Sequence, residues 1–274
     1  MLETQRISYW WANRMLQTNR PLEEKMTLFW HGHFATTEDK VRDYRKMLKQ
    51  NELFRQKATG NYRDLLIATA KDPAMLAFLD AAVNVKGAPN ENFAREIMEL
   101  FTMGVGNYTE KDIQEAARAF TGWNYKNLSF VKIANQHDSD SKVVLGKTGN
   151  FDGEHVIDII LSKEATSEYM ASKLYRYFVR EDVSPELKKK LGALLKKSNY
   201  EIAPFLTTVF LSKDFYSDES ISNQQSLLFT QTIQYDVRAS QDIFVFGDSF
   251  PQGDSNLCTS GNSSTWSSDR NDFS

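Results

Sequence analysis

Two histidines separated by a glycine are the residues in this sequence whose types and spacing most directly indicate a chemical function. His31 and His33 flank Gly32. On a regular helix, residues two apart point about 200° away from each other, but a helix end or an extended segment, which Gly32 allows, places both imidazoles on one face. Imidazole nitrogens bind zinc, iron, copper or nickel. The pair, with Glu96 as the next ligand, therefore predicts a site for a divalent transition metal.

Carboxylates and a further histidine supply the other groups that such a site needs, because zinc takes three or four protein ligands. Glu96 and Glu99 are three residues apart and so share one face of a helix. His137 and Asp138 are adjacent in a polar segment that closes the site from a loop in this interpretation. The predicted catalytic groups are Glu96, Glu99, His137 and Asp138.

The same residues also have a structural interpretation, which the sequence leaves open. The segment Trp30–Phe34 is equally suited to aromatic packing around hydrogen-bonded core histidines. Glu96 and Glu99 have Arg95 and Arg118 as partners for structural salt bridges. A polar active site without a metal is the third alternative.

A helix must present the two glutamates, and the sequence marks both of its ends. Asn90 is a favourable N-cap, and Gly104 suits the residue after a helix C-terminus. The buried stripe of this helix is predicted to be Phe93, Ile97, Leu100 and Phe101.

Further helices are predicted along the first two-thirds of the chain from apolar periodicity and capping signals. Thr36 with Asp39 predicts a charged helix from about 38 to 57, and Thr109 with Asp112 begins another. Residues 123–153 are instead rich in Asn, Ser, Asp and Gly, with β-like pieces at 129–133 and 142–145. We expect a mainly α, multi-helix globular domain with a small loop or β-hairpin insertion near 123–153.

The composition changes after Lys213, which is the last lysine of the chain. Polar residues dominate from Ser217 onward, and no capped amphipathic helix can be traced. The expected organisation is a helical domain over 1–216 and a divergent, disordered tail over 217–274. A broken gene end and a functional acidic tail are both compatible with this tail.

Bulk properties exclude several classes of protein. The formal net charge of −3 argues against a dedicated nucleic-acid binder. Cys258 is the single cysteine, so neither an internal disulfide nor a cysteine-based metal site can form. No run of 18 apolar residues is present, so no transmembrane segment is expected. The N-terminus opens directly into an amphipathic pattern and shows no signal peptide.

Several motifs occur in the order found in the bacterial family called domain of unknown function 1800, which the chain resembles from about residue 10 to residue 216. The motifs are Phe29–Phe34, Asn90–Gly104, Tyr108–Asp112, Ala116–Trp123, His137–Asp138, Gly149–Gly153 and Lys173–Val179. The resemblance implies a largely helical, often exported protein, and it carries over no catalytic residue. Family members usually have further helices before this segment, so the N-terminal part of the usual domain is expected to be absent.

Two functional hypotheses of different class follow. The first is a metal-assisted enzyme of the bacterial envelope, hydrolytic or oxidative, with the histidines and glutamates above at its site. The alternative is a non-catalytic binding or assembly module of the cell envelope, in which the polar motifs only maintain the fold. Neither the substrate nor the partner follows from the sequence.

Overall fold

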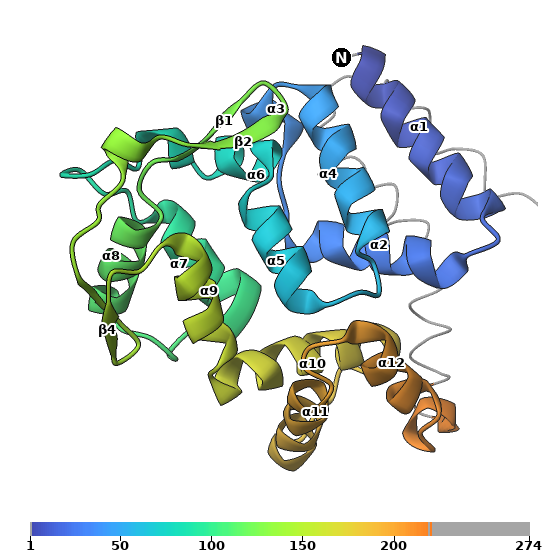
Figure 1. The fold of residues 1–274 in the computed structure, drawn as a ribbon. Helices are drawn as coiled ribbons and strands as arrows, with labels where there is room; N and C mark the ends of the chain where they lie inside the picture. The colour runs from blue at the N-terminus through green and yellow to red at the C-terminus, as the bar shows by residue number, and fades with distance from the viewer. Residues whose placement is uncertain (1, 219, 221–274) are drawn as a thin grey trace, which may run out of the picture.

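Helices form most of the protein in the computed structural model, which describes residues 2–218 and residue 220 (Figure 1). The expected mainly α fold class is confirmed, and the strands form two small antiparallel hairpins. Residues 221–274 lie outside the described residues, as does most of the tail expected from residue 217. Within the described part of the chain, no helix is long and apolar enough to cross a membrane.

The first half of the chain contains the helices that begin on the right of Figure 1 and continue through its centre to its left side. In order they are α1 (Leu2–Gln17), α2 (Pro21–His33), α3 (Glu38–Val41), α4 (Tyr44–Gln56), α5 (Tyr62–Ala70), α6 (Pro73–Phe78) and the 3-10 turn η1 (Ala81–Val83). The next are α7 (Asn92–Met98), the π-helix η2 (Glu99–Met103) and α8 (Glu110–Ala119).

The second half begins with the hairpins and returns to helices. The strands are β1 (Trp123–Lys126), β2 (Ser129–Lys132), β3 (Lys142–Val144) and β4 (Lys147–Gly149), with the 3-10 turn η3 (Ala134–Gln136) between β2 and β3. The helices are α9 (Gly153–Leu161), α10 (Glu164–Phe178), α11 (Pro185–Lys197), α12 (Ile202–Phe210) and the 3-10 turn η4 (Asp214–Tyr216). The predicted insertion near 123–153 is therefore a pair of hairpins.

Side-chain caps explain where several of these helices begin. The Asp72 carboxylate accepts hydrogen bonds from the backbone N–H groups of Ala74 and Met75 at the start of α6. Thr109 and Asp112 form the predicted capping box of α8, in which each side chain accepts from the other's backbone N–H. Such caps satisfy N–H groups that have no partner within the helix.

One predicted helix is wrong in its length. The segment predicted as a single helix from about 38 to 57 is divided into α3 and α4. Arg42 adopts a left-handed backbone conformation with φ of 52°, which ends α3. Asp43 then caps the new helix by accepting from the backbone N–H of Arg45 at 3.1 Å. The polar residues of this stretch therefore end one helix and begin another.

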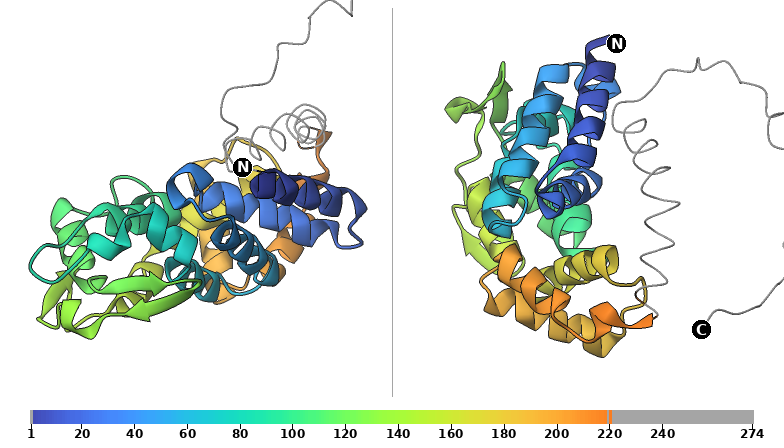
Figure 2. Two further views of the ribbon diagram at one scale, coloured as in Figure 1. Left: turned by 90° about the horizontal axis from the view of Figure 1, so that it is seen from above. Right: turned by 90° about the vertical axis from the view of Figure 1, so that its right-hand side faces the viewer.

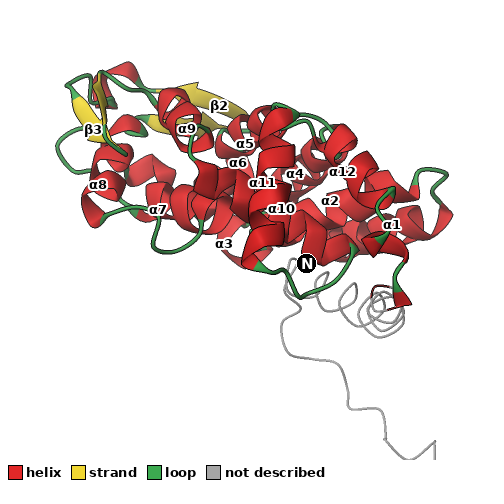
Figure 3. Ribbon diagram, turned by 90° about the horizontal axis from the view of Figure 1, so that it is seen from below, coloured by secondary structure: helices red, strands yellow, loops and turns green. Residues whose placement is uncertain are grey.

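An apolar core runs through the middle of an elongated molecule. Figures 2 and 3 show α8 and the hairpin β3–β4 toward one end and α1 at the other. Trp30, Tyr62 and Phe34 are fully buried, and Trp123 is buried beside α6 and the Phe93 ring of α7. The helix α10 packs along both α11 and η2. Because α2, α5 and α10 all contact η2, the π-helix lies where distant parts of the chain meet.

Candidate active site

The helix that carries the two glutamates changes its geometry at Glu99. From there η2 continues α7 as a π-helix, in which the backbone N–H of Gly104 donates to the carbonyl of Glu99 at 3.0 Å. Gly104 then ends the turn with φ of 75°, as its predicted position after the helix requires. A π-turn contains an extra residue, and such turns are frequently found at functional sites.

The wider turn corrects one sequence prediction. Leu100 was expected in the buried stripe, but 48% of its surface is exposed. Phe93, Ile97 and Phe101 are buried as expected. The π-turn rotates the chain after Met98 out of the 3.6-residue period on which the prediction rested.

Side chains from three other helices hold the carbonyl groups of the π-turn. His33 of α2 donates from Nε2 to the Phe101 carbonyl oxygen at 3.0 Å, and the Tyr62 hydroxyl of α5 donates to the same oxygen. The Tyr169 hydroxyl of α10 donates to the carbonyl of Leu100 at 3.1 Å. These bonds fix the π-turn relative to α2, α5 and α10.

His33 is buried, and its partners define its tautomer. Because a carbonyl only accepts, Nε2 carries the proton that is donated to Phe101. The other nitrogen, Nδ1, therefore has a lone pair, and it lies 3.2 Å from Nζ of Lys173. Burial, and then the nearby Lys173 charge, hold the pKa of His33 well below its usual value. His33 is thus a neutral imidazole at physiological pH.

His31 lies in a different environment. It is 1% exposed, and Nδ2 of Asn51 donates to its Nε2 at 3.0 Å. The rings of Trp11 and Phe54 contact it, with centroids 4.6 and 5.0 Å away. Burial and the charge of Arg55 lower the pKa of His31 to about 3. The contacts are those of a hydrogen-bonded core histidine, the structural alternative in the sequence interpretation.

The structure does not bring the predicted metal ligands His31, His33 and Glu96 into one shared set of contacts. The two imidazoles bind different partners, and both ring nitrogens of His33 are engaged. Over residues 2–218 and 220, no group of three or more His, Cys, Asp or Glu side chains is arranged to hold a metal ion. The metal site stays a prediction.

Glu96 and Glu99 lie on the partly exposed side of the same helix. Burial, and then the charge of Glu99, raise the pKa of Glu96. The Glu99 carboxylate accepts a hydrogen bond from the Tyr108 hydroxyl. Burial and the Glu99 charge also raise the pKa of Tyr169. Glu99 is therefore the negative charge to which Glu96, Tyr108 and Tyr169 all respond.

The salt bridges proposed for these glutamates are absent from the described part of the chain. Arg95 pairs instead with Glu91 and Glu110, at 3.1 and 2.6 Å. Arg118 pairs with Glu115 and Asp138. Glu96 and Glu99 are consequently available for roles other than ion pairing with these arginines.

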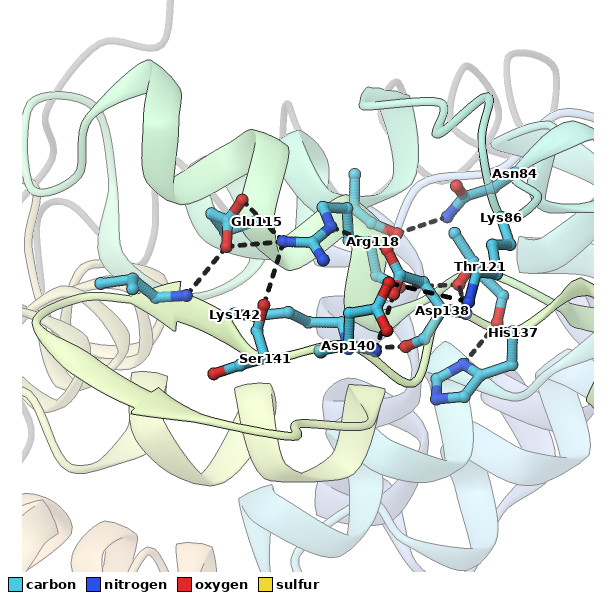
Figure 4. Close-up of polar contacts among 12 residues, drawn as sticks. Asn84, Lys86, Glu115, Arg118, Thr121, His137, Asp138, Asp140, Ser141 and Lys142 are labelled. Carbon is cyan, nitrogen blue, oxygen red and sulfur yellow. Dashed lines mark hydrogen bonds and ion pairs between the residues drawn. The ribbon is translucent and has the colours of Figure 1, made fainter.

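His137 and Asp138 belong to a second network, shown in Figure 4, which ties the loop after β2 to the end of α8. Nδ1 of His137 donates to the Thr121 carbonyl at 2.9 Å, and the backbone N–H of Asp138 donates to the Thr121 hydroxyl at 2.7 Å. Arg118 donates to the Asp138 carboxylate at 2.8 Å. The His137 ring points away from the ion pair of Arg118 and Asp138.

Lys142 completes this second network and was missed from the sequence. Its side chain is fully buried, and Nζ donates to the carbonyls of Asp138 and Asp140 at 2.6 and 2.8 Å. Burial opposes ionisation of Asp138, but the hydrogen bonds from Arg118 and the Asp140 N–H outweigh it and lower the pKa of Asp138. These contacts fix the loop and give Asp138 a structural role.

The predicted catalytic groups therefore divide between two networks. Glu96 is on α7 and Glu99 begins the π-helix, whereas His137 and Asp138 are at the loop. Among the described residues, no hydrogen bond or ion pair joins the two sets. Sequence reasoning also missed Tyr62, Tyr108, Tyr169 and Lys173 around the π-helix, although Tyr108 and Lys173 are the first residues of two family-like motifs.

A comparison with family models identifies the family of the chain. The model described as protein of unknown function DUF1800 matches residues 2–235. The chain belongs to this family. The match extends beyond the 10–216 range of the motifs at both ends. No curated protein and no solved structure matches the chain.

Proposed function

We propose that this domain is a hydrolytic enzyme whose active site is the partly exposed side of α7 and of the start of the π-helix. Glu96 and Glu99 form its pair of carboxyl groups. The observation that carries the proposal is the different environment of the two groups, one partly buried and one hydrogen-bonded to a tyrosine. A carboxyl group whose pKa is raised by its environment, beside a second carboxyl group in a different environment, is typical of acid–base catalysis.

Each residue has a definite role in this proposal. Glu96 is the general acid, because a raised pKa keeps a proton on a carboxyl group closer to neutral pH. Glu99 is the carboxylate that activates water, and Tyr108 orients it through the hydroxyl hydrogen bond. The carbonyl bonds from His33, Tyr62 and Tyr169 keep the π-turn rigid beneath them, so that the pair is pre-organised.

The test is hydrolysis of chromogenic ester, glycoside and peptide substrates by the full chain and by the variant Glu96→Gln. The variant is expected to lose about 100-fold or more in kcat on the accepted substrate class, the usual contribution of a general acid. Its stability is expected to stay the same or rise, because the substitution removes repulsion from Glu99.

Glu186→Gln is the matched control, because Glu186 is exposed at the start of α11. It is expected to retain the full rate. Hydrolysis by Glu96→Gln at the wild-type rate, or no hydrolysis of any substrate class by the wild type, would overturn the proposal. The same assay after treatment with a chelator tests the predicted metal ligands, because a metal that assists catalysis would make the rate depend on metal.

A non-catalytic assembly role remains the second candidate because of the outer face of α1. Tyr9 and Leu16 are exposed there, at 68% and 85%. Exposed apolar side chains gathered on one helix are a feature of interaction surfaces. The hydrolysis assay separates the candidates, since an assembly module has no activity for Glu96→Gln to remove. Placement in the bacterial envelope rests on the resemblance alone and stays a prediction.

A further inference from the structure

An open pocket of about 470 Å³ lies between α10 and α11, and none of its lining residues takes part in the proposed hydrolysis. Figure 1 shows the two helices side by side in the lower part of the molecule. Gly192 allows their close approach, because a Cβ atom there would lie only 2.8 Å from the Cα of Glu168. Pockets of this volume are in the range that binds small ligands.

Charged side chains of both signs line this pocket. Glu164 and Glu168 are one turn apart on the same face of α10. Lys189, Lys196 and Lys197 come from α11, where a spacing of seven and eight residues returns to one face. Within the described part of the chain, none of these five side chains forms an ion pair. Their charges are therefore available to a ligand.

The charges follow an order along the pocket. At one end, Nζ of Lys196 donates at 3.3 Å to the carbonyl of Ser162, which immediately precedes the start of α10. Glu168 is level with Gly192, about one turn further along. Lys189 is seven residues before Lys196, so the two lysines are about 10 Å apart along the axis of α11. The carboxylates thus lie between cations at the two ends.

We propose that this pocket binds a short acidic peptide with a free amino group. The peptide ammonium faces Glu164 and Glu168, and two peptide carboxylates face the lysines at the two ends. Three lysines and two glutamates give the pocket a formal charge of +1, which such a ligand complements with −1. Two extended residues span about 7 Å, and the flexible lysine side chains reach the remaining distance. The inference does not rest on the carboxyl pair of the proposed hydrolase.

Calorimetric titration of the full chain with the dipeptide glutamyl-alanine tests the proposal. Saturable binding is expected, with an affinity that falls as the salt concentration rises. N-acetyl-glutamyl-alanine lacks the ammonium, and glutaminyl-alanine lacks one carboxylate. Each is expected to bind about fivefold more weakly, the loss that one exposed charge pair produces at most. Lysyl-alanine, which reverses the side-chain charge, is expected to bind more weakly still.

Two results of these titrations would overturn the proposal. The first is the absence of saturable binding of glutamyl-alanine. The second is equal or tighter binding of the acetylated dipeptide, because a pocket that ignores the ammonium is a simple anion site in which the two glutamates have no role.

Variants then place the binding in the pocket. Glu168→Gln and Lys196→Gln each remove one charge at nearly constant size, and each is expected to weaken binding of glutamyl-alanine about fivefold. Ala193→Phe fills the pocket, keeps all five charges and is expected to abolish binding; Ala193 is exposed, so the larger ring does not enter the core. Lys188→Gln is the matched control, because Lys188 is exposed on α11 but does not line the pocket.

The control variant is expected to keep the wild-type affinity. Equal weakening by Lys188→Gln and Lys196→Gln would contradict the proposal, because it would show a response to the net charge of α11 alone. Wild-type affinity in Ala193→Phe would also contradict it, since the dipeptide would then bind elsewhere. Urea titrations of each variant check that it is folded.

Discussion

At the scale of single residues, the two histidines of the H-x-H motif illustrate how burial determines chemistry. His31 and His33 are both neutral, because each ring is buried and has a cation nearby, Arg55 for one and Lys173 for the other. A folded-state pKa below the unfolded value means that only the unfolded chain takes up the proton as the pH falls. The contribution of the two neutral histidines to folding stability is therefore complete above about pH 6.5, and it is lost as the pH falls below that value.

The variant His31→Gln tests this at the residue scale. With a pKa of about 3 in the folded state, His31 alone should remove about 2 kcal/mol of stability between pH 8 and pH 5. Urea unfolding at the two pH values measures this loss. The variant, whose amide can still accept from Asn51, should show a difference smaller by about that amount. An unchanged difference would mean that His31 is protonated in the folded protein.

At the scale of elements, the π-helix is where the tertiary fold alters the local structure. Three side chains from α2, α5 and α10 bind carbonyls that an α-helix would direct along its own axis. The bonds from His33 and Tyr62 share one acceptor, the carbonyl of Phe101. The turn is thus held by donors from three different helices.

Tyr62→Phe is the prediction at this scale. The buried hydroxyl is lost, but the Phe101 carbonyl keeps its bond from His33, so no buried acceptor is left without a partner. The cost in free energy of unfolding should therefore be modest, about 1 kcal/mol. Tyr44→Phe, at an exposed tyrosine, should change the stability by less than about 0.5 kcal/mol in the same urea titrations. A loss above about 3 kcal/mol would show that the π-turn depends on this hydroxyl.

At the scale of the whole molecule, one buried carboxylate joins the helices α1, α2 and α4. Glu24 is 2% exposed and accepts from Nε of Arg55 at 2.7 Å and from Nε of Arg14 at 2.5 Å. Trp11 donates to it as well, at 3.1 Å. Burial opposes ionisation of Glu24, but these hydrogen bonds outweigh it and lower its pKa.

Replacement of this carboxylate is expected to have a large effect. Glu24→Ala leaves the guanidinium of Arg55 buried without its main partner, which typically costs about 3–5 kcal/mol. Glu23→Ala is the adjacent control, because Glu23 pairs with the exposed Arg20 and its replacement should cost less than about 1 kcal/mol. Urea denaturation measures both variants. Equal losses would show that the Glu24 network does not hold α1 and α4 to α2.

The sequence by itself determined the local features of this protein. The mainly α fold, the caps at Asp72 and Thr109 and the hairpin segments follow from interactions between residues a few positions apart, and these appear directly in the order of residues. The three-residue spacing of Glu96 and Glu99 likewise placed both on one helix face. The prediction of a single helix from 38 to 57 was wrong because of a local detail, the left-handed backbone conformation of Arg42.

Only the tertiary structure decided which groups share a site. The contact between His33 and Lys173, the exposure of Leu100 and the burial of Lys142 depend on packing between elements far apart in the chain. Periodicity assumes a regular helix, so it cannot predict a π-turn that other helices stabilise. It also cannot separate His137 and Asp138 from the glutamates, because the distance between two residues in space is set by the packing of the helices that carry them.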